Sequence, residues 1–434
     1  MTRRPHPRAR RSIQAAYAPR MLVADRAGQV CSTALTAVGR SGREYCPIEH
    51  WVPMPPGAQL LTMPDCRPVG MRSGERVALS EGLPVAVALP HGYTRTYLPA
   101  YAKDIAAPLL PLFGYTAVAE RDGEFVVAAL QTDDAPEWRP SAFGRPDLEP
   151  RIVALQRDMP ANALVRQISK CAGEYGCYTA QNVFYDRWEA ALPTSNACNA
   201  SCIGCISEQE ADGPPTPQER IRAMARQRDV VEVAVRHLER ADPAMVSFGQ
   251  GCEGEPLLNW RMLVAATEAI RRRTGRGWIN VNTNGCNPRA MAALITAGLD
   301  ACRVSVFSAR QDIFAAYYRP RNYSFSDVEA TLSVASAAGL FTSVNLLTFP
   351  GITDQEREAD AMIAMLRRTG TRMVQMRNLT IDPEQLLDAL PSPDSAVLGV
   401  ETFVQRLRSE LPGLVIGNSS RLPRPSAPEA NAAR

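Results

Sequence analysis

The stretch that decides the fold of this chain runs from residue 198 to residue 205 and reads Cys198-Asn-Ala-Ser-Cys202-Ile-Gly-Cys205. Three thiols this close together can hold three corners of one [4Fe–4S] cube, whose irons ordinarily take four cysteine ligands. The fourth iron is then open to another molecule. The alternative is a zinc site, which usually takes four nitrogen or sulfur ligands at similar spacings.

Five further segments follow the triplet, each at the end of an apolar stretch or within one, as buried strands require. They are Ser247-Phe-Gly-Gln-Gly-Cys-Glu-Gly-Glu-Pro256, Asn282-Thr-Asn-Gly285, Arg303-Val-Ser-Val306, Val344-Asn-Leu-Leu-Thr-Phe-Pro-Gly351 and Val374-Gln-Met-Arg377. In this order they resemble the second to sixth strand motifs of the radical S-adenosylmethionine (SAM) enzymes, and the triplet resembles that family's cluster motif. The resemblance covers roughly residues 190 to 380, less than half of the chain.

Strand and helix patterns alternate after residue 190, which predicts a parallel sheet with right-handed crossovers. We count six such units, which matches the partial (β/α)₆ TIM-type barrel of the family and makes the fold class α/β. Within it, Asn287-Pro288 opens a helix and Gly298 closes it. Thr216-Pro-Gln-Glu219 reads as a capping box with proline at the first helical position, and predicts a helix that begins there.

Residues 21–150 predict a separate β-rich domain of unknown role. Its prolines exclude long helices, and Asp122-Gly123 is a hairpin turn signal between two apolar runs. The segment from Pro90 to Pro99 either touches a substrate or is a solvated loop, and we favour the loop. Residues 1–20 are expected to be a disordered basic tail, 151–190 a helical connector, 191–412 the barrel, and 413–434 a mostly disordered C-terminal tail.

Composition limits the function. The 434 residues carry a net charge of only +3, which argues against a nucleic-acid binder with its concentrated basic face. No apolar run reaches the roughly 18–20 residues that span a bilayer, so no membrane partner is expected. Eleven cysteines in a long chain without a secretory signal fit reduced thiols and metal binding. We therefore expect a cytoplasmic protein.

The resemblance also implies SAM contacts. In the family, the open iron chelates the amino and carboxylate groups of SAM. Gly254 and Glu255 align with the family's Gly-Glu-Pro motif, so that Glu255 accepts a hydrogen bond from the ammonium group; the alternative is a plain turn before a helix. Asn284, Ser305 and Arg303 stand where the family contacts the carboxylate and ribose. Arg303 could equally pair with Glu255.

Two more positions, Asn345 and Met376, align with the residues that meet the adenosine, although methionine is more often core filler. Where the family usually has an aromatic residue before the third cysteine, this chain has Gly204, so adenine packing is expected from Ile203. Glu253 replaces the first glycine of the family's Gly-Gly-Glu-Pro motif. We expect it to be a solvated loop residue, the alternative being a general acid or base.

The remaining cysteines suggest further chemistry. Cys171 and Cys177 could give two ligands to a second metal site, with Cys46 and Cys66 as conceivable partners; the alternative is buried free thiols. Cys252 is a candidate redox or hydrogen-donor residue. The others, Cys286 and Cys302, flank strands and are expected in the core.

The activity that the resemblance implies is reductive cleavage of SAM to methionine and a 5′-deoxyadenosyl radical, which abstracts a hydrogen atom from a substrate. The substrate, a small molecule or a peptide, is not specified by the sequence. The electron donor is expected to be a ferredoxin or flavodoxin. The alternative from another class is a non-catalytic Fe–S or zinc protein that serves as a scaffold or sensor.

Overall fold

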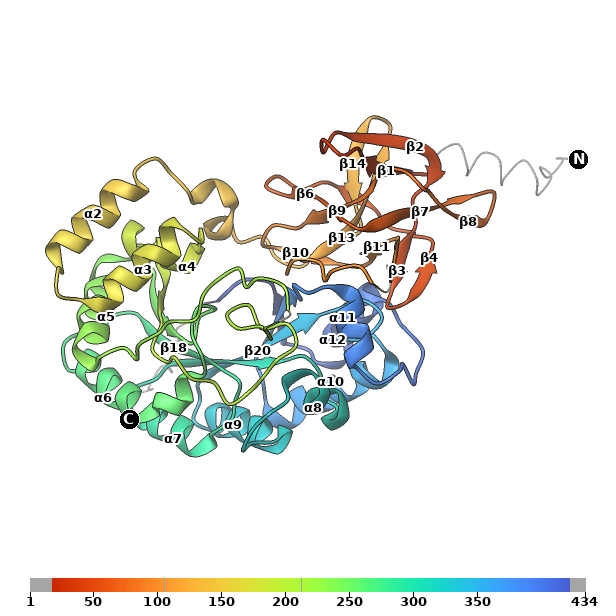
Figure 1. Ribbon diagram of the computed structural model, residues 1–434. Coiled ribbons are helices and arrows are strands. Elements are labelled where there is room, and N and C mark those ends of the chain that lie inside the picture. The colour runs from red at the N-terminus through yellow and green to blue at the C-terminus, as the bar shows by residue number, and fades with distance from the viewer. Residues whose placement is uncertain (1–17, 105, 212, 422–434) are drawn as a thin grey trace, which may run out of the picture.

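A computed structural model describes residues 18–104, 106–211 and 213–421, and shows a β-rich N-terminal domain, a short helical segment and a barrel (Figure 1). The basic tail expected at residues 1–20 lies almost wholly outside the described residues. Arg20, at its end, already opens the first strand and donates to Glu120 at 2.6 Å.

The N-terminal domain is built on a ten-stranded antiparallel sheet in which β13 and β14 form the hairpin predicted at Asp122-Gly123. Small sheets of β11, β3 and β4 and of β10 and β15 flank it. The strands are β1 (Arg20–Ala24), β2 (Val30–Thr36), β3 (Gly39–Ser41), β4 (Glu44–Cys46), β5 (Val52–Pro53), β6 (Gln59–Thr62), β7 (Cys66–Arg72), β8 (Glu75–Ala78), β9 (Leu83–Ala88), β10 (Tyr93–Arg95), β11 (Leu98–Pro99), β12 (Tyr101–Lys103), β13 (Tyr115–Arg121), β14 (Glu124–Val127) and β15 (Ala129–Gln131).

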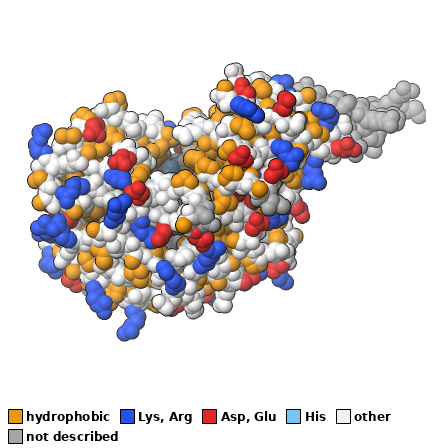
Figure 2. All heavy atoms as spheres, viewed as in Figure 1, with side chains coloured by type: hydrophobic (Ala, Val, Ile, Leu, Met, Phe, Trp, Pro, Cys, Tyr) orange, Lys and Arg blue, Asp and Glu red, His pale blue; other side chains and the backbone are white. Residues whose placement is uncertain are grey.

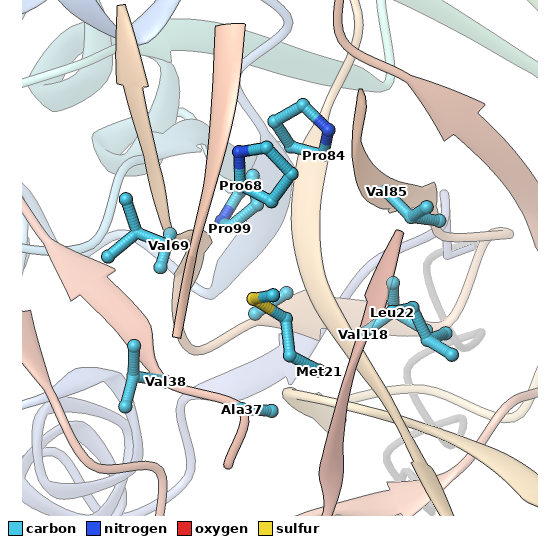
Figure 3. Close-up of a pocket in the computed structure, with 12 residues that line it drawn as sticks. Met21, Leu22, Ala37, Val38, Pro68, Val69, Pro84, Val85, Pro99 and Val118 are labelled. Carbon is cyan, nitrogen blue, oxygen red and sulfur yellow. The ribbon is translucent and has the colours of Figure 1, made fainter. Parts of the chain in front are cut away.

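A small cavity lies inside this domain. Met21, Leu22, Val69, Pro84 and Val85 are among the mostly apolar side chains that surround it (Figure 3). Its volume of about 20 Å³ is close to the space of one water molecule. It is therefore a packing gap and too small for a substrate.

Helices connect the two larger parts. Two 3₁₀ turns, η1 (Pro136–Trp138) and η2 (Pro140–Ala142), lead into α2 (Leu148–Asp158), α3 (Ala163–Gly173) and α4 (Tyr178–Tyr185). The N-terminus of α3 is capped by Asn162, whose side chain accepts hydrogen bonds from Leu164 and Val165. The first barrel strand then begins at Trp188.

The barrel is a curled sheet of parallel strands with helices on its outer side (Figure 1), which confirms the predicted partial TIM-type fold. In sheet order the strands are β16 (Trp188–Leu192), β17 (Ala244–Phe248), β18 (Trp278–Thr283), β19 (Ala301–Val306), β20 (Phe341–Thr348), β21 (Met373–Asn378) and β22 (Val415–Gly417). The helices are α5 (Gln227–Arg240), α6 (Trp260–Arg271), α7 (Pro288–Ala297), α8 (Gln311–Tyr318), α9 (Phe325–Ala337), α10 (Glu356–Thr369), α11 (Pro383–Ala389) and α12 (Val400–Glu410), with the turn η3 (Pro256–Asn259) before α6.

Two expectations need correction here. Strand β22 pairs with β21, and Asn418, Ser419 and Ser420 after it are buried, so residues 413–421 belong to the fold. The rest of the expected tail, 422–434, lies outside the described residues. No helix begins at the capping box at 216–219; the next helix, α5, begins at Gln227. The helix predicted from Asn287-Pro288 to Gly298 is confirmed as α7: Asn287 caps Ala290, and Gly298, at φ 107°, ends it.

Buried polar contacts hold the N-terminal domain against the C-terminal part of the barrel. Lys103 pairs with Asp382 at 2.5 Å, and both side chains are almost fully buried. Arg95 is fully buried and donates to the carbonyl oxygens of Thr348 and Leu379, at 3.3 and 2.8 Å. Buried hydrogen-bonded groups fix geometry because they lose solvation when they separate. The domain thus has a defined place above the carboxyl ends of the strands.

A search of the described helices finds none with both the length and the apolar composition that a membrane span requires.

Candidate active site

A cavity of about 790 Å³ lies where the carboxyl ends of the barrel strands face the N-terminal domain. Figure 2 shows a hollow between that domain and the lobe that carries α2–α4. Loops at this edge build the active sites of parallel barrels. Most of the sequence-predicted residues line the cavity: Cys198, Cys202, Cys205, Gly254, Glu255, Asn284, Arg303, Ser305 and Asn345.

The three thiols lie on the loop after β16. Helix α8 anchors this loop, because Ser201 and Ile203 donate their backbone N–H groups to the carbonyl oxygens of Tyr318 and Tyr317, at 3.0 and 3.1 Å. All eleven cysteines of the chain are free, so no disulfide competes for these thiols.

Burial opposes the ionisation of two of the three thiols, and raises the pKa of Cys198 and of Cys202. Burial, and then the proximity of Cys205 and Cys198, raises the pKa of Cys202 well above its ordinary value. Thiolates are the metal ligands, so a bound positive charge is needed to hold them deprotonated. Among the described residues, no group of three or more His, Cys, Asp or Glu side chains converges on a single ion. This absence does not argue against an iron–sulfur cluster, because each thiolate of a cube binds a different iron and the three need not meet at one point.

The loop after β17 carries two buried carboxylates. Glu253 accepts hydrogen bonds from the backbone of Thr194, Ser195 and Gly249 at 2.7, 2.8 and 2.6 Å. It is only 6% exposed, so the expectation of a solvated loop residue is wrong. Burial raises its pKa to about 7. Glu253 does not line the cavity, and its bonds tie two loops together.

Glu255 does line the cavity. One carboxylate oxygen accepts from the hydroxyl of Thr283 at 2.5 Å and from the N–H of Leu257 at 2.9 Å; the other accepts from the N–H of Asn284 at 2.7 Å. Burial raises the pKa of Glu255 to about 7, although these three donors oppose the rise. Glu255 therefore lies fixed at the cavity wall, and its charge varies near neutral pH.

The backbone between these carboxylates passes very close to the cysteine loop. Gly254 donates to the carbonyl oxygen of Ser195 at 2.7 Å, and Glu255 to that of Ala197 at 2.8 Å. A Cβ atom at position 254 would lie 2.0 Å from the carbonyl oxygen of Ala197. Only glycine fits at this crossing.

We therefore predict that Gly254→Ala lowers the free energy of unfolding by about 3 kcal/mol, because the clash is with backbone that cannot rotate away. Urea denaturation measures the change. The matched control is Gly275→Ala, where an added Cβ meets nothing within 4 Å; it should shift the free energy by about 0.5 kcal/mol or less. Equal effects at both positions would contradict the close approach.

Arg303 does not pair with Glu255. Its guanidinium lies 3.4 Å from Glu189, on β16, and donates to Asn282 and Ser420 at 2.8 Å each. Burial raises the pKa of Glu189, but Arg303 and the hydroxyls of Ser247 and Ser420 outweigh it, so that the pKa is lowered. Glu189 stays ionised and neutralises Arg303.

Of the two predicted adenosine contacts, only one lines the cavity. Asn345 lines the cavity, and its carbonyl oxygen is buried without a hydrogen-bond partner. Met376 does not line it: its side chain is fully buried in the core, while its neighbours Gln375 and Arg377 face the cavity. Side chains alternate along a strand, so the predicted face was shifted by one residue.

Gly204 lines the cavity, but Ile203 is buried in the core and does not. A Cβ at Gly204 would lie 3.0 Å from both the Tyr317 hydroxyl and Leu379. These two side chains also line the cavity. They fill the place that an aromatic residue at 204 would need. The prediction that Ile203 packs on the adenine is wrong, because Ile203 lies in the core and not at the cavity.

The second metal site is not supported. The Sγ atom of Cys171 lies 3.4 Å from that of Cys252, whereas Cys46 and Cys66 lie in the N-terminal domain. Cys252 is the neighbour that the sequence analysis missed, since the two thiols are 81 residues apart. Cys302 is fully buried and packs in the core.

Further cavity residues were missed as well. Glu189, Arg377 and His91 all line the cavity. The only available signal for the first two was a charged residue within an otherwise apolar strand. For His91, the segment from Pro90 was expected to be a solvated loop, whereas Pro90 and His91 contribute to the cavity wall.

Residues 192–363 match the family model described as the radical SAM superfamily. A curated relative, GTP 3′,8-cyclase of Streptomyces coelicolor (strain ATCC BAA-471 / A3(2) / M145), is 30% identical over 168 residues, which are 37% of this chain and 45% of that protein. The match thus spans less than half of the relative's length.

Solved structures with a similar fold include the FeFe-hydrogenase maturase HydG from Carboxydothermus hydrogenoformans (16% identity, 64% of this chain and 72% of that chain covered, TM-score 0.37). Another is a radical SAM methyltransferase from Sphaerobacter thermophilus (18% identity, 53% and 65% covered, TM-score 0.37). Proteins of the superfamily are enzymes that generally bind a [4Fe–4S] cluster and cleave SAM to a radical. The barrel segment 192–363 of this chain therefore matches the radical SAM superfamily.

Proposed function

We propose that this chain is a radical SAM enzyme: Cys198, Cys202 and Cys205 would hold a [4Fe–4S] cluster, and SAM would bind in the same cavity. The observation that carries the proposal is the convergence of three free thiols and the buried Glu255 on one cavity. When bound, the cluster and SAM supply a 5′-deoxyadenosyl radical, which takes a hydrogen atom from the substrate.

The residues fit this pair of cofactors. Glu255 is placed to accept a hydrogen bond from the ammonium of SAM, since three neutral donors fix its carboxylate and no cation of the described residues pairs with it. The orphaned carbonyl oxygen of Asn345 needs a donor, which an adenosine supplies. Tyr317 and Leu379 offer an apolar surface for the adenine. Ser305, Asn284, Gly254 and Arg303 complete the wall.

The N-terminal domain and the helical segment close the other side of the cavity. They contribute His91, Trp138, Cys177 and Tyr178, among others. A closed site excludes water and protects a reactive intermediate. We propose that these residues select the substrate, a small molecule or a peptide, and that a ferredoxin or flavodoxin in the cytoplasm provides the electron.

The test is anaerobic reconstitution with iron and sulfide, reduction with dithionite, and assay of 5′-deoxyadenosine. We expect slow formation by the natural protein and none by a Cys198/Cys202/Cys205→Ala triple variant. An intact [4Fe–4S] spectrum without SAM cleavage would favour a scaffold or sensor, and zinc as the only bound metal would refute the cluster.

The affinity for SAM is predicted to rise with pH. The pKa of Glu255 is about 7 in the SAM-free protein because the side chain is buried. With that pKa, about a tenth of the side chain is ionised at pH 6 and about three quarters at pH 7.5, so the dissociation constant should fall about eightfold. α-Amino groups titrate near pH 8, so part of the SAM ammonium is already neutral at pH 7.5, and the fall is expected to be at most about eightfold. Calorimetric titration of SAM measures it; an affinity that falls across this range would contradict the role of Glu255.

A further inference from the structure

One charge in the cavity is left unbalanced. The charged side chains that line it are Glu189, Glu255, Arg303 and Arg377. Glu189 neutralises Arg303, and Glu255 takes only neutral donors. Within the described part of the chain, no carboxylate lies within ion-pair distance of Arg377. Its contacts are His91 Nδ1 and the carbonyl oxygen of Asn418, both 3.0 Å from Nη1.

The neighbours of Arg377 are neutral. Burial, and then Arg377 itself, lowers the pKa of His91 to about 3, so the imidazole is uncharged. The guanidinium cannot accept a hydrogen bond, so Nδ1 of His91 accepts one and the ring hydrogen lies on Nε2. Burial and then repulsion by Arg303 lower the pKa of Arg377 to about 10, although the charge of Glu189, which is beyond ion-pair distance, opposes the fall; Arg377 is therefore charged at neutral pH.

A partly buried cation without an anion is costly, and such a site gains stability when an anion binds. The Nη2 and Nε atoms of Arg377 have no protein acceptor in the described residues, so the one edge of the planar guanidinium that these two atoms form is free to donate. This fork matches a carboxylate or phosphate in two parallel hydrogen bonds.

The position of Arg377 points to the substrate. It lies on β21, four strands in sheet order from β17, whose loop carries Glu255, and five from β16, whose loop carries the thiols. The elements that approach it are the His91 segment of the N-terminal domain and Asn418 after β22. His91 itself stacks on Trp138, with ring centroids 5.6 Å apart. An anion at Arg377 would therefore be enclosed by the N-terminal domain and by the segment that follows β22.

We propose that Arg377, with His91 beside it, binds an anionic group of the substrate, a carboxylate or a phosphate. This inference rests on the proposed function, which it makes specific: the substrate is an anion whose charged end lies at Arg377, beside the SAM site.

The experiment uses the full chain, reconstituted anaerobically and saturated with SAM, and titrates it calorimetrically with inorganic phosphate and, separately, with acetate. We expect saturable binding of at least one of these anions, and the one that binds more tightly identifies a phosphate or a carboxylate. Arg377→Met should weaken it at least about tenfold. The matched control is Arg408→Gln, an exposed arginine on α12, which should leave binding unchanged.

Two readouts separate a binding role from a structural one. The Arg377→Met variant loses two hydrogen bonds, to His91 and Asn418, but also a cation without a counter-ion. These effects oppose each other, so the variant should unfold close to the temperature of the natural protein, and its affinity for SAM should be unchanged. A lower unfolding temperature with anion binding intact would overturn the proposal. So would weaker SAM binding with anion binding intact, since Arg377 would then serve the cofactor.

The outcome is also independent of the chemistry of the cluster. If the natural protein forms no 5′-deoxyadenosine but still binds the anion through Arg377, the proposed function fails and the anion site stands. If SAM is cleaved and neither anion binds in a manner that depends on Arg377, the inference fails alone.

Discussion

Cys202→Ala is expected to abolish the formation of 5′-deoxyadenosine and to leave the reconstituted protein with little iron. Cys202 is the middle thiol of the triplet and lies among the other two, whose proximity contributes to its raised pKa. Loss of a residue outside the ligand set already costs about 10–100-fold in metal affinity or activity, so loss of a ligand should cost at least about 100-fold. Iron content and product yield are the two measurements.

The control for this variant is Cys302→Ala. Cys302 is a fully buried thiol on β19 that does not line the cavity. The control should keep its iron and activity, because the substitution removes one core sulfur and no ligand. If Cys202→Ala kept full iron content while Cys302→Ala lost it, the ligand assignment would be wrong.

Glu255→Gln is expected to raise the dissociation constant for SAM about 10–100-fold, since a hydrogen bond to a charged partner contributes about 1.5–3 kcal/mol. The amide also turns one acceptor into a donor toward Leu257, Thr283 or Asn284, which now all donate to the carboxylate. Equilibrium dialysis with labelled SAM on the reconstituted protein measures the effect.

The matched control is Glu268→Gln, an exposed carboxylate on α6 with half of its side chain accessible. It should bind SAM as the natural protein does. The pH dependence of SAM affinity predicted above should also disappear in Glu255→Gln and persist in the control. Retention of full affinity by Glu255→Gln would remove Glu255 from the site.

The barrel could be predicted because the sequence signals of each strand and each turn lie within a few neighbouring residues. Strands buried on both faces read as apolar runs, and polar residues follow directly where each strand ends. The cysteine triplet and the Gly254-Glu255-Pro256 turn each lie within ten residues, so their spacing alone brings them together. The helix from Asn287-Pro288 to Gly298 was likewise marked at both ends.

Contacts distant in sequence could not be predicted. Glu189 and Arg303 are 114 residues apart, and His91 and Arg377 are 286 apart. Nothing in a local pattern connects such pairs. Glu253 was misjudged for the same reason, because its donors on Thr194 and Ser195 come from another loop.

The missing helix at 216–219 shows tertiary contacts overriding a local signal. Glu219 pairs with Lys170 at 2.9 Å, Arg220 donates to Ser207 at 3.4 Å, and the N–H of Ile221 bonds to the carbonyl oxygen of Cys252 at 2.9 Å. The Ile221 N–H is a backbone group that a helix would use, and the two side-chain contacts hold the segment against the cavity, which Pro217 and Gln218 line. Helix propensity is a weak preference beside such contacts.

The central claim is that three thiols hold a cluster whose open iron takes SAM. The most direct measurement is the electron paramagnetic resonance spectrum of the dithionite-reduced, reconstituted protein before and after addition of SAM with ¹⁵N in its amino group. The account predicts a [4Fe–4S] signal that changes shape with SAM and shows nuclear coupling to the ¹⁵N atom. A reduced cluster whose spectrum is the same with and without SAM would contradict it.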